Sequence, residues 1–176
     1  DRFGRKHALL VGLAIVGLVS ALTAQYATTS EHVIGARGLM GLGAALVMPA
    51  TLSVIVVVFP PEERGKAVGV WVGMAGVGAP IGLLVGGWAV ENFDWRAVFW
   101  INPPIIALAM VLSILLVPNS RDKAGSPMDP VGGALSVGGL GFVLFAIIEG
   151  PSMGWTSAEV LSLGATGLVL SFLFIW

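Results

Sequence analysis

Residues 67–90 read AVGVWVGMAGVGAPIGLLVGGWAV, a stretch of 24 residues without a charged side chain. The hydrocarbon core of a bilayer needs about 20 apolar residues in a helix that crosses it, so this stretch is long enough. Lipid offers no partner to backbone N–H and C=O groups, and the alternating pattern of a membrane barrel is missing. The stretch therefore predicts a membrane-spanning α-helix.

The rest of the chain repeats this pattern. Hydrophobic residues make up 56% of the sequence and charged residues only 11%, whereas a soluble domain carries about 25% charged residues. We therefore predict an all-α membrane protein with six transmembrane helices. The predicted spans are residues 8–26, 33–58, 67–90, 97–117, 130–148 and 160–176. Because the chain opens at Asp1 and stops inside the last apolar run, we expect it to be an interior stretch of a longer protein.

The lysines and arginines between the spans predict the orientation, because short connectors that carry them stay on the cytoplasmic side. Counted in order, the connectors hold three, none, two, one, two and none, so alternate connectors hold seven against one. The connectors that contain Arg2, Arg64 and Arg121 are therefore predicted to be cytoplasmic, and the other three to face outward. This orientation places the chain in a cell membrane as a multi-pass protein.

Arg37 is the only ionisable residue well inside a predicted span, where a charge costs about 2.5 to 3.5 kcal/mol on insertion scales. Gly41, Ala44 and Ala45 follow at offsets of 4, 7 and 8, so they share its helix face and would let another helix approach closely. Two interpretations stay open. Arg37 either faces inward, where it binds substrate or responds to a titrating carboxylate, or it snorkels to the headgroups at the outer end of the span.

Glycines mark one face of the third span. Gly78, Gly82 and Gly86 repeat every four residues, which leaves that face almost without side chains. Pro80 removes one backbone hydrogen bond and predicts a kink. This pattern favours either simple close packing or a smooth, bendable helix along which two halves of a transporter rock.

Several segments resemble the major facilitator superfamily, specifically its 14-helix branch of drug:proton antiporters. The first connector, DRFGRK, resembles the loop motif between helices 2 and 3 of that family, and the run that starts at Arg37 resembles its helix 4 motif. Their order and spacing along six spans carry the resemblance. The matching segments are residues 1–6, 37–45, 95–104, 129–132 and 149–155.

The resemblance implies a numbering and a domain organisation. The spans would be helices 3 to 8 of the longer chain. Residues 1–117 would belong to the N-terminal helical bundle, residues 118–128 would form a cytoplasmic loop, and residues 129–176 would form the extra central helix pair of the 14-helix branch.

The resemblance also implies roles for individual residues. Arg37 would take part in proton coupling or substrate binding. In the helix 5 antiporter motif a leucine stands where the family has proline, at Leu83, so the direction of transport is open. The cytoplasmic gating loop would consist of Asp1, Arg2, Gly4, Arg5 and Lys6, and the helix-packing and antiporter motifs would consist of Gly41, Gly78, Pro80, Gly82, Gly86 and Gly87.

The function implied by the resemblance is proton-coupled efflux of drugs or other amphipathic small molecules across the cytoplasmic membrane. Its partners would be the transported compound, protons and the bilayer, with any membrane-fusion or outer-membrane partner unidentified. The alternatives are a transporter of another cargo, such as a siderophore, lipid, peptide or sugar, a uniporter, and, furthest from the resemblance, a scaffold or channel.

Other classes of function lack their signatures. The spans contain no metal-ligand cluster, no paired aspartates and no serine beside a base, and we expect His7 and His32 to lie in connectors. The chain has no cysteine and a net charge of -1, so thiolate metal sites are excluded and no basic field attracts nucleic acid. We therefore predict a protein that is not an enzyme and needs neither metal nor cofactor.

Overall fold

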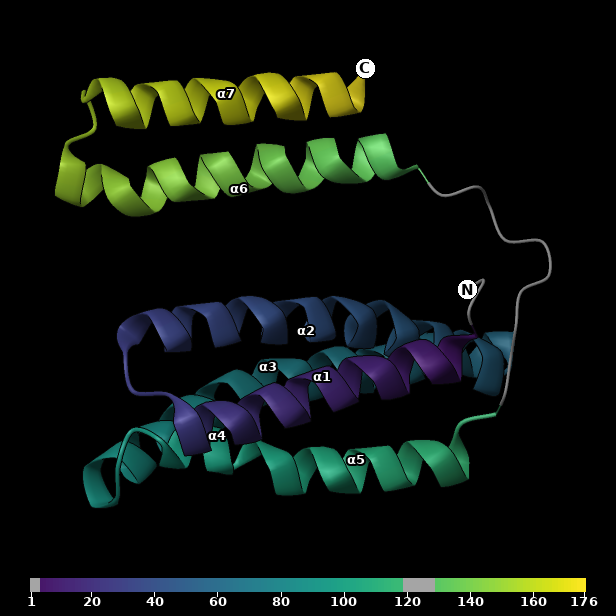
Figure 1. The fold of residues 1–176 in the computed structure, drawn as a ribbon. Helices are drawn as coiled ribbons and strands as arrows, with labels where there is room; N and C mark the ends of the chain where they lie inside the picture. The colour runs from purple at the N-terminus through teal and green to yellow at the C-terminus, as the bar shows by residue number, and fades with distance from the viewer. Residues whose placement is uncertain (1–3, 119–128) are drawn as a thin grey trace. The chain divides into compact units, whose positions relative to one another are not determined.

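The computed structural model describes residues 4–118 and 129–176, and every regular element in these ranges is an α-helix (Figure 1). Six helical segments are long and apolar enough to cross a membrane, which confirms the predicted fold class and the six spans. The predictions for Asp1, Arg2 and Arg121 lie outside the described residues. The helices are α1 (Arg5–Tyr26), α2 (Ser30–Val58), α3 (Pro61–Asn92), α4 (Ala97–Trp100), α5 (Asn102–Leu116), α6 (Pro130–Met153) and α7 (Ala158–Ile175).

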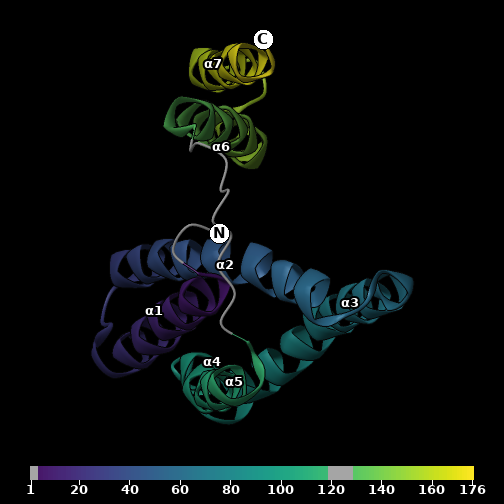
Figure 2. The same ribbon diagram turned by 90° about the vertical axis from the view of Figure 1, so that its right-hand side faces the viewer.

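The chain forms two compact units, which are residues 1–125 and 126–176. The first contains α1 to α5 and the second contains α6 and α7. In the first unit α1 packs against α2, α4 and α5, whereas α3 contacts only α2 and α4 (Figure 2). Of the 32 residues of α3 only Ala89 is buried, so α3 is the most open helix of this unit.

The helices extend further than their apolar cores, and the connectors are correspondingly shorter than predicted. Lys6 and His7 belong to the first turns of α1, His32 belongs to α2, and Arg64 lies in the first turn of α3. The prediction that both histidines lie in connectors is therefore wrong. Hydropathy falls where charged residues begin, but lysine, arginine and glutamate are good helix formers and continue a helix into the headgroup layer.

Two glycines with positive φ mark helix boundaries. Gly4 has φ 86° and precedes α1, and Gly154 has φ 90° and ends α6. Only glycine adopts this backbone region without a steric penalty, so both boundaries require this residue. Helix α6 runs through Pro151 to Met153, so the segment at 149–151 lies inside the helix rather than at its end.

A pair of glycines sets the contact between α1 and α2. A Cβ atom placed on Gly12 would lie 2.7 Å from the carbonyl oxygen of Gly43, and one on Gly43 would lie 2.8 Å from the carbonyl oxygen of Gly12. These backbones touch, so neither position has room for a methyl group. Small residues of this kind are the usual means of close helix packing in membranes.

We expect Gly43→Ala to destabilise the protein by about 1 to 3 kcal/mol, the typical cost of an overpacked contact. The new methyl group would press on backbone rather than on a flexible side chain, because Gly12 O lies in its path. Gly41→Ala on the same helix is the matched control, since a Cβ there meets no atom within 4 Å. Thermal unfolding of the full-length protein in detergent measures both, and equal melting temperatures for the two variants would contradict the glycine contact.

Two prolines leave carbonyl groups of the α4–α5 segment free, and α1 supplies the donors. Proline has no N–H, so Pro103 cannot bond to the carbonyl of Phe99 four residues earlier. The buried hydroxyl of Ser20 donates to Phe99 O instead, at 2.9 Å. Pro118 likewise leaves Ile114 O free, and Lys6 Nζ donates to it at 2.7 Å. Pro103 near the start of α5 and Pro118 just after its end thus leave two carbonyl groups to which α1 donates.

The second unit is a helical hairpin. Its helices meet at Gly139 and Gly167, where a Cβ on Gly167 would lie 2.8 Å from Gly139 O. Asp129 caps α6 by accepting a hydrogen bond from Gly132 N at 2.8 Å. The ring of Trp155 packs on Gly150, 2.7 Å from the position of a Cβ there. The hairpin thus uses the same glycine contact as α1 and α2.

Candidate transport cavity

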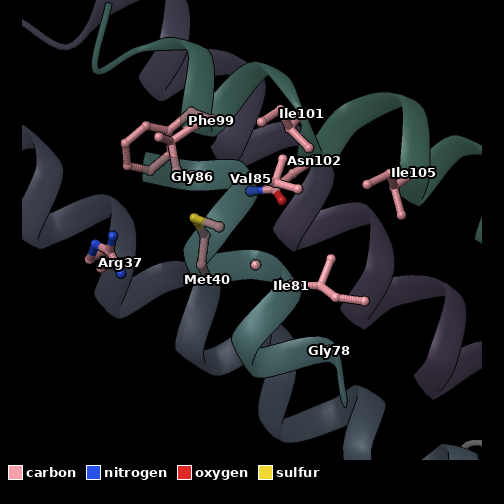
Figure 3. A pocket seen from close by; sticks show the side chains of 12 residues that line it. Arg37, Met40, Gly78, Ile81, Val85, Gly86, Phe99, Ile101, Asn102 and Ile105 are labelled. Carbon is pink, nitrogen blue, oxygen red and sulfur yellow. The ribbon is translucent and has the colours of Figure 1, made fainter. Parts of the chain in front are cut away.

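The first unit encloses a cavity of about 510 Å³ between α2, α3 and the α4–α5 segment. Figure 3 shows that its walls come from three sides, with Arg37 and Met40 on α2 and Asn102 on α5. Of the described residues that line it, Arg37 is the only charged one. The lining residues are Arg37, Met40, Gly78, Ile81, Gly82, Val85, Gly86, Val98, Phe99, Ile101, Asn102 and Ile105.

Arg37 lies at the cavity, seven residues after the start of α2 at Ser30. Arg37 is therefore about 10 Å along the helix axis from the N-terminal end of α2. Its guanidinium carbon is 5.9 Å from the centroid of the Phe99 ring, within the range of a cation–π contact. Arg37 is exposed in this unit and lines the cavity, and no salt bridge joins it to a carboxylate of residues 4–118 or 129–176.

The glycine face of α3 forms the opposite wall. Gly78, Gly82 and Gly86 all line the cavity, and a Cβ on any of them would meet no atom within 4 Å. The cavity therefore has its width because three successive turns of α3 carry no side chain. The predicted antiporter positions Pro80 and Gly87 lie on α3 but not among the lining residues.

The face that follows Arg37 on α2 is not packed. A Cβ on Gly41 meets nothing within 4 Å, and Ala44 and Ala45 are exposed. Within the described residues the close approach predicted for this face is absent, and α2 makes its close contact at Gly43 instead. The gating residues Gly4, Arg5 and Lys6 lie at the start of α1, away from the cavity, where Lys6 bonds to the end of α5.

The connector before α4 adds an arginine that sequence reasoning did not single out. Arg96 Nη2 donates to the carbonyl of Ala27, which follows α1, at 2.8 Å. Its guanidinium carbon lies 5.4 Å from the Trp95 ring, which in turn meets the Phe99 ring edge-on at 6.0 Å. Because Arg37 also contacts the Phe99 ring, pairwise contacts link Arg96, Trp95, Phe99 and Arg37. The adjacent residues Trp95 and Arg96 in the sequence could have indicated this cation–π contact.

The described residues contain no group of three or more histidines, cysteines, aspartates or glutamates that could hold a metal ion. The cavity wall is apolar except for Arg37 and Asn102. The lining residues include no nucleophile and no acid–base pair, and they combine apolar side chains with one cation and one amide.

Six apolar helices define a multi-pass helical membrane protein, and its first unit has a cavity bordered by one cation. Comparison with known proteins gives the family. The model of the Major Facilitator Superfamily matches residues 1–176, so the chain belongs to that superfamily of transporters. Such membership supports the prediction that the chain is not an enzyme.

Several relatives with assigned roles are similar to the chain over almost its whole length. The multidrug efflux pump LfrA of Mycolicibacterium smegmatis is 38% identical over 176 residues, which is 99% of this chain and 34% of that protein. The multidrug resistance protein Stp of Mycobacterium tuberculosis is 33% identical over 177 residues, covering 100% of this chain and 33% of that protein. The methylenomycin A resistance protein of Streptomyces coelicolor is 35% identical over 174 residues, 98% of this chain and 36% of that protein. The chain thus spans about a third of the length of these relatives.

Proposed function

We propose that the complete protein exports drugs or other amphipathic small molecules in exchange for protons, and that this chain supplies helices 3 to 8 of a 14-helix transporter. The observation that carries the proposal is the apolar cavity of about 510 Å³ bordered by Arg37. Ligand pockets for small organic molecules measure about 300 to 1,000 Å³ and combine apolar walls with few polar groups. The names of the relatives, two of them multidrug proteins, support the same cargo class.

Transport follows from a cavity that opens to one side of the membrane at a time. The compound and the proton each shift this equilibrium only by their different affinities for the two states. Arg37 supplies a fixed positive charge beside the site, so a proton that arrives on a nearby acid changes the electrostatic energy of the site. The acid that carries the proton is expected outside this chain, in the first helix of the longer protein.

The organisation of the longer protein extends the proposal. Residues 1–117 belong to its N-terminal bundle, residues 118–128 to a cytoplasmic loop and residues 129–176 to the central helix pair. The gating role of the first connector draws support from the bond between Lys6 and Ile114 O, which ties α1 to the end of α5. Release of that bond would free the ends of the two helices to separate, as alternating access requires. The connectors at Arg2, Arg64 and Arg121 face the cytoplasm in this proposal.

Filling the cavity tests the proposal. We expect Gly82→Phe in the full-length protein to lower ethidium efflux from energised vesicles at least about tenfold, because a benzyl group occupies the space where the dye binds. Gly76→Phe is the matched control, since Gly76 has no atom within 4 Å of its Cβ position and does not line the cavity. The wild-type efflux should also stop when a protonophore collapses the proton gradient.

Three outcomes would contradict the proposal. Efflux that persists after the gradient is collapsed would exclude proton coupling and favour a uniporter or channel. Equal efflux by Gly82→Phe and wild type would exclude this cavity as the route. If the wild-type protein moves no amphipathic dye, the cargo belongs to another class, such as a siderophore, lipid, peptide or sugar.

A further inference from the structure

A buried polar network connects α1 to the wall of the cavity. Ser20 of α1 has no exposed surface, and its hydroxyl donates to Phe99 O at 2.9 Å. The hydroxyl oxygen of Ser20 in turn accepts a hydrogen bond from Asn102 Nδ2, also at 2.9 Å. Phe99 and Asn102 both line the cavity, whereas Ser20 lies behind them. The network therefore lies directly behind Phe99 and Asn102, which the α4–α5 segment presents to the cavity.

The carbonyl of Phe99 fixes the direction of every hydrogen bond in this network. A carbonyl oxygen can only accept, and Pro103 has no N–H that could donate to it, so Phe99 O is open to the hydroxyl of Ser20. The hydroxyl of Ser20 has a single proton, which it donates to that carbonyl. Its oxygen can then only accept, so the amide group of Asn102 must turn its Nδ2 toward Ser20. The orientation of an asparagine carboxamide is ordinarily ambiguous, but here it follows from the hydroxyl of Ser20, whose single proton is already donated to the Phe99 carbonyl.

This orientation leaves Oδ1 as the free atom of the Asn102 carboxamide. No donor among the described residues reaches Oδ1, although Asn102 lines the cavity beside Ile101 and Ile105 (Figure 3). An amide oxygen without a donor in a cavity with otherwise apolar walls requires a hydrogen-bond donor from whatever fills the cavity. Arg37 can serve anions and acceptors but cannot accept, so the two polar groups of the wall have opposite roles.

We propose that Asn102 Oδ1 is a specificity-determining acceptor for a hydroxyl or N–H group of the transported compound, and that Ser20 is the positioning residue that holds it in this orientation. The inference rests on the proposed function in one respect, that the cavity is where the compound binds. The inference adds a selection rule. A compound with a hydroxyl or N–H group that can donate to Asn102 Oδ1 binds better than an analogue in which that group is alkylated. A purely structural role, in which Ser20 and Asn102 only join α1 to α5, predicts no such discrimination.

A pair of bisbenzimide dyes tests this rule, because one carries a free phenol and the other carries the ethyl ether of the same phenol. Both fluoresce strongly when they leave water, so their binding to the purified full-length protein can be titrated directly. We expect the wild-type protein to bind the phenol about three- to tenfold more tightly than the ether, the value of one hydrogen bond. Asn102→Leu should reduce this ratio to about one while the ether binds as before.

Ser20→Ala tests the positioning role. Without the hydroxyl, the carboxamide of Asn102 loses the partner that holds Nδ2, so Oδ1 no longer has a fixed position at the cavity and the ratio should fall toward one although Asn102 is intact. Ser113→Ala is the matched control, because it removes a hydroxyl of the same size from another buried serine that does not line the cavity. Ser113→Ala should keep the wild-type ratio. Loss of packing alone would weaken both dyes equally and leave the ratio unchanged.

The outcomes separate the inference from the proposed function. A wild-type ratio near one, or a ratio in Asn102→Leu equal to that of the wild type, would overturn the inference. Failure of the wild type to bind either dye would overturn it as well. A preserved ratio in a protein that binds the dyes but does not export them would uphold the inference and contradict the transport proposal.

Discussion

Replacing Arg37 by methionine is expected to lower proton-driven efflux by the full-length protein about tenfold to a hundredfold. Methionine is an unbranched side chain, somewhat shorter than arginine, that removes the charge together with the N–H donors of the guanidinium. A unit charge about 6 Å from a titrating carboxylate contributes of the order of 1 to 3 kcal/mol at an effective dielectric constant of about 20 or more. That energy is what would make protonation change the balance between the inward- and outward-facing states. Dye efflux from energised vesicles measures the loss.

Two further variants separate charge from geometry. Arg37→Lys keeps the charge but replaces the planar guanidinium over the Phe99 ring, so it should retain part of the activity. Glu31→Gln changes the charge of the same helix by one unit at its exposed first turn, outside the cavity, and should leave efflux unchanged. Full activity of Arg37→Met would mean that Arg37 only reaches for the headgroups, the interpretation that the sequence also allowed.

The six spans were predictable from the sequence because each depends on a local property. A run of about 20 apolar residues crosses lipid as a helix whatever its neighbours are, since no other backbone structure satisfies its own hydrogen bonds there. The interruption between α4 and α5 was also predictable from a local property, because Pro103 and Pro104 have no backbone N–H to donate within a helix. The helix ends were less predictable, since residues such as Lys6 and His7 continue a helix after hydropathy has fallen.

The candidate site was predictable only in part. Arg37 and the glycines of α3 stand out because a charge and a run of missing side chains are unusual in an apolar segment, and the structure brings them to one cavity. Ser20 could not be identified in this way. Its partners lie 79 and 82 residues away in the sequence, and an isolated serine in a membrane helix is common. A rule that pairs buried hydroxyls with the carbonyls that prolines leave free would have singled it out.

The two faces of α2 show why glycine patterns alone are ambiguous. Gly41 and Gly43 look equivalent in the sequence, but only Gly43 meets another backbone in this structure. The contact depends on the matching glycine at Gly12 of α1, which supplies the second smooth surface. Helix packing is a property of two surfaces, so the spacing of glycines in one helix does not identify the face that is used.

The alternation of the connectors across the membrane is the central claim, since the cavity can alternate between two sides only if α2 crosses the bilayer. Helix α2 contains 29 residues, or about 43 Å, which exceeds the hydrocarbon core of about 30 Å. Glu31 is exposed in the first turn of α2, and Glu63 is exposed beyond its other end, in the first turn of α3. The chain has no cysteine of its own.

The direct measurement is labelling of Glu31→Cys and Glu63→Cys, each in the full-length protein freed of other cysteines, by a membrane-impermeant maleimide. In sealed cells the reagent should label Glu31→Cys, and it should label Glu63→Cys only after the membrane is permeabilised, because the proposed topology has the cationic connector beside Arg64 on the cytoplasmic side. Labelling of Glu63→Cys from outside sealed cells would contradict the topology and the transport mechanism that depends on it.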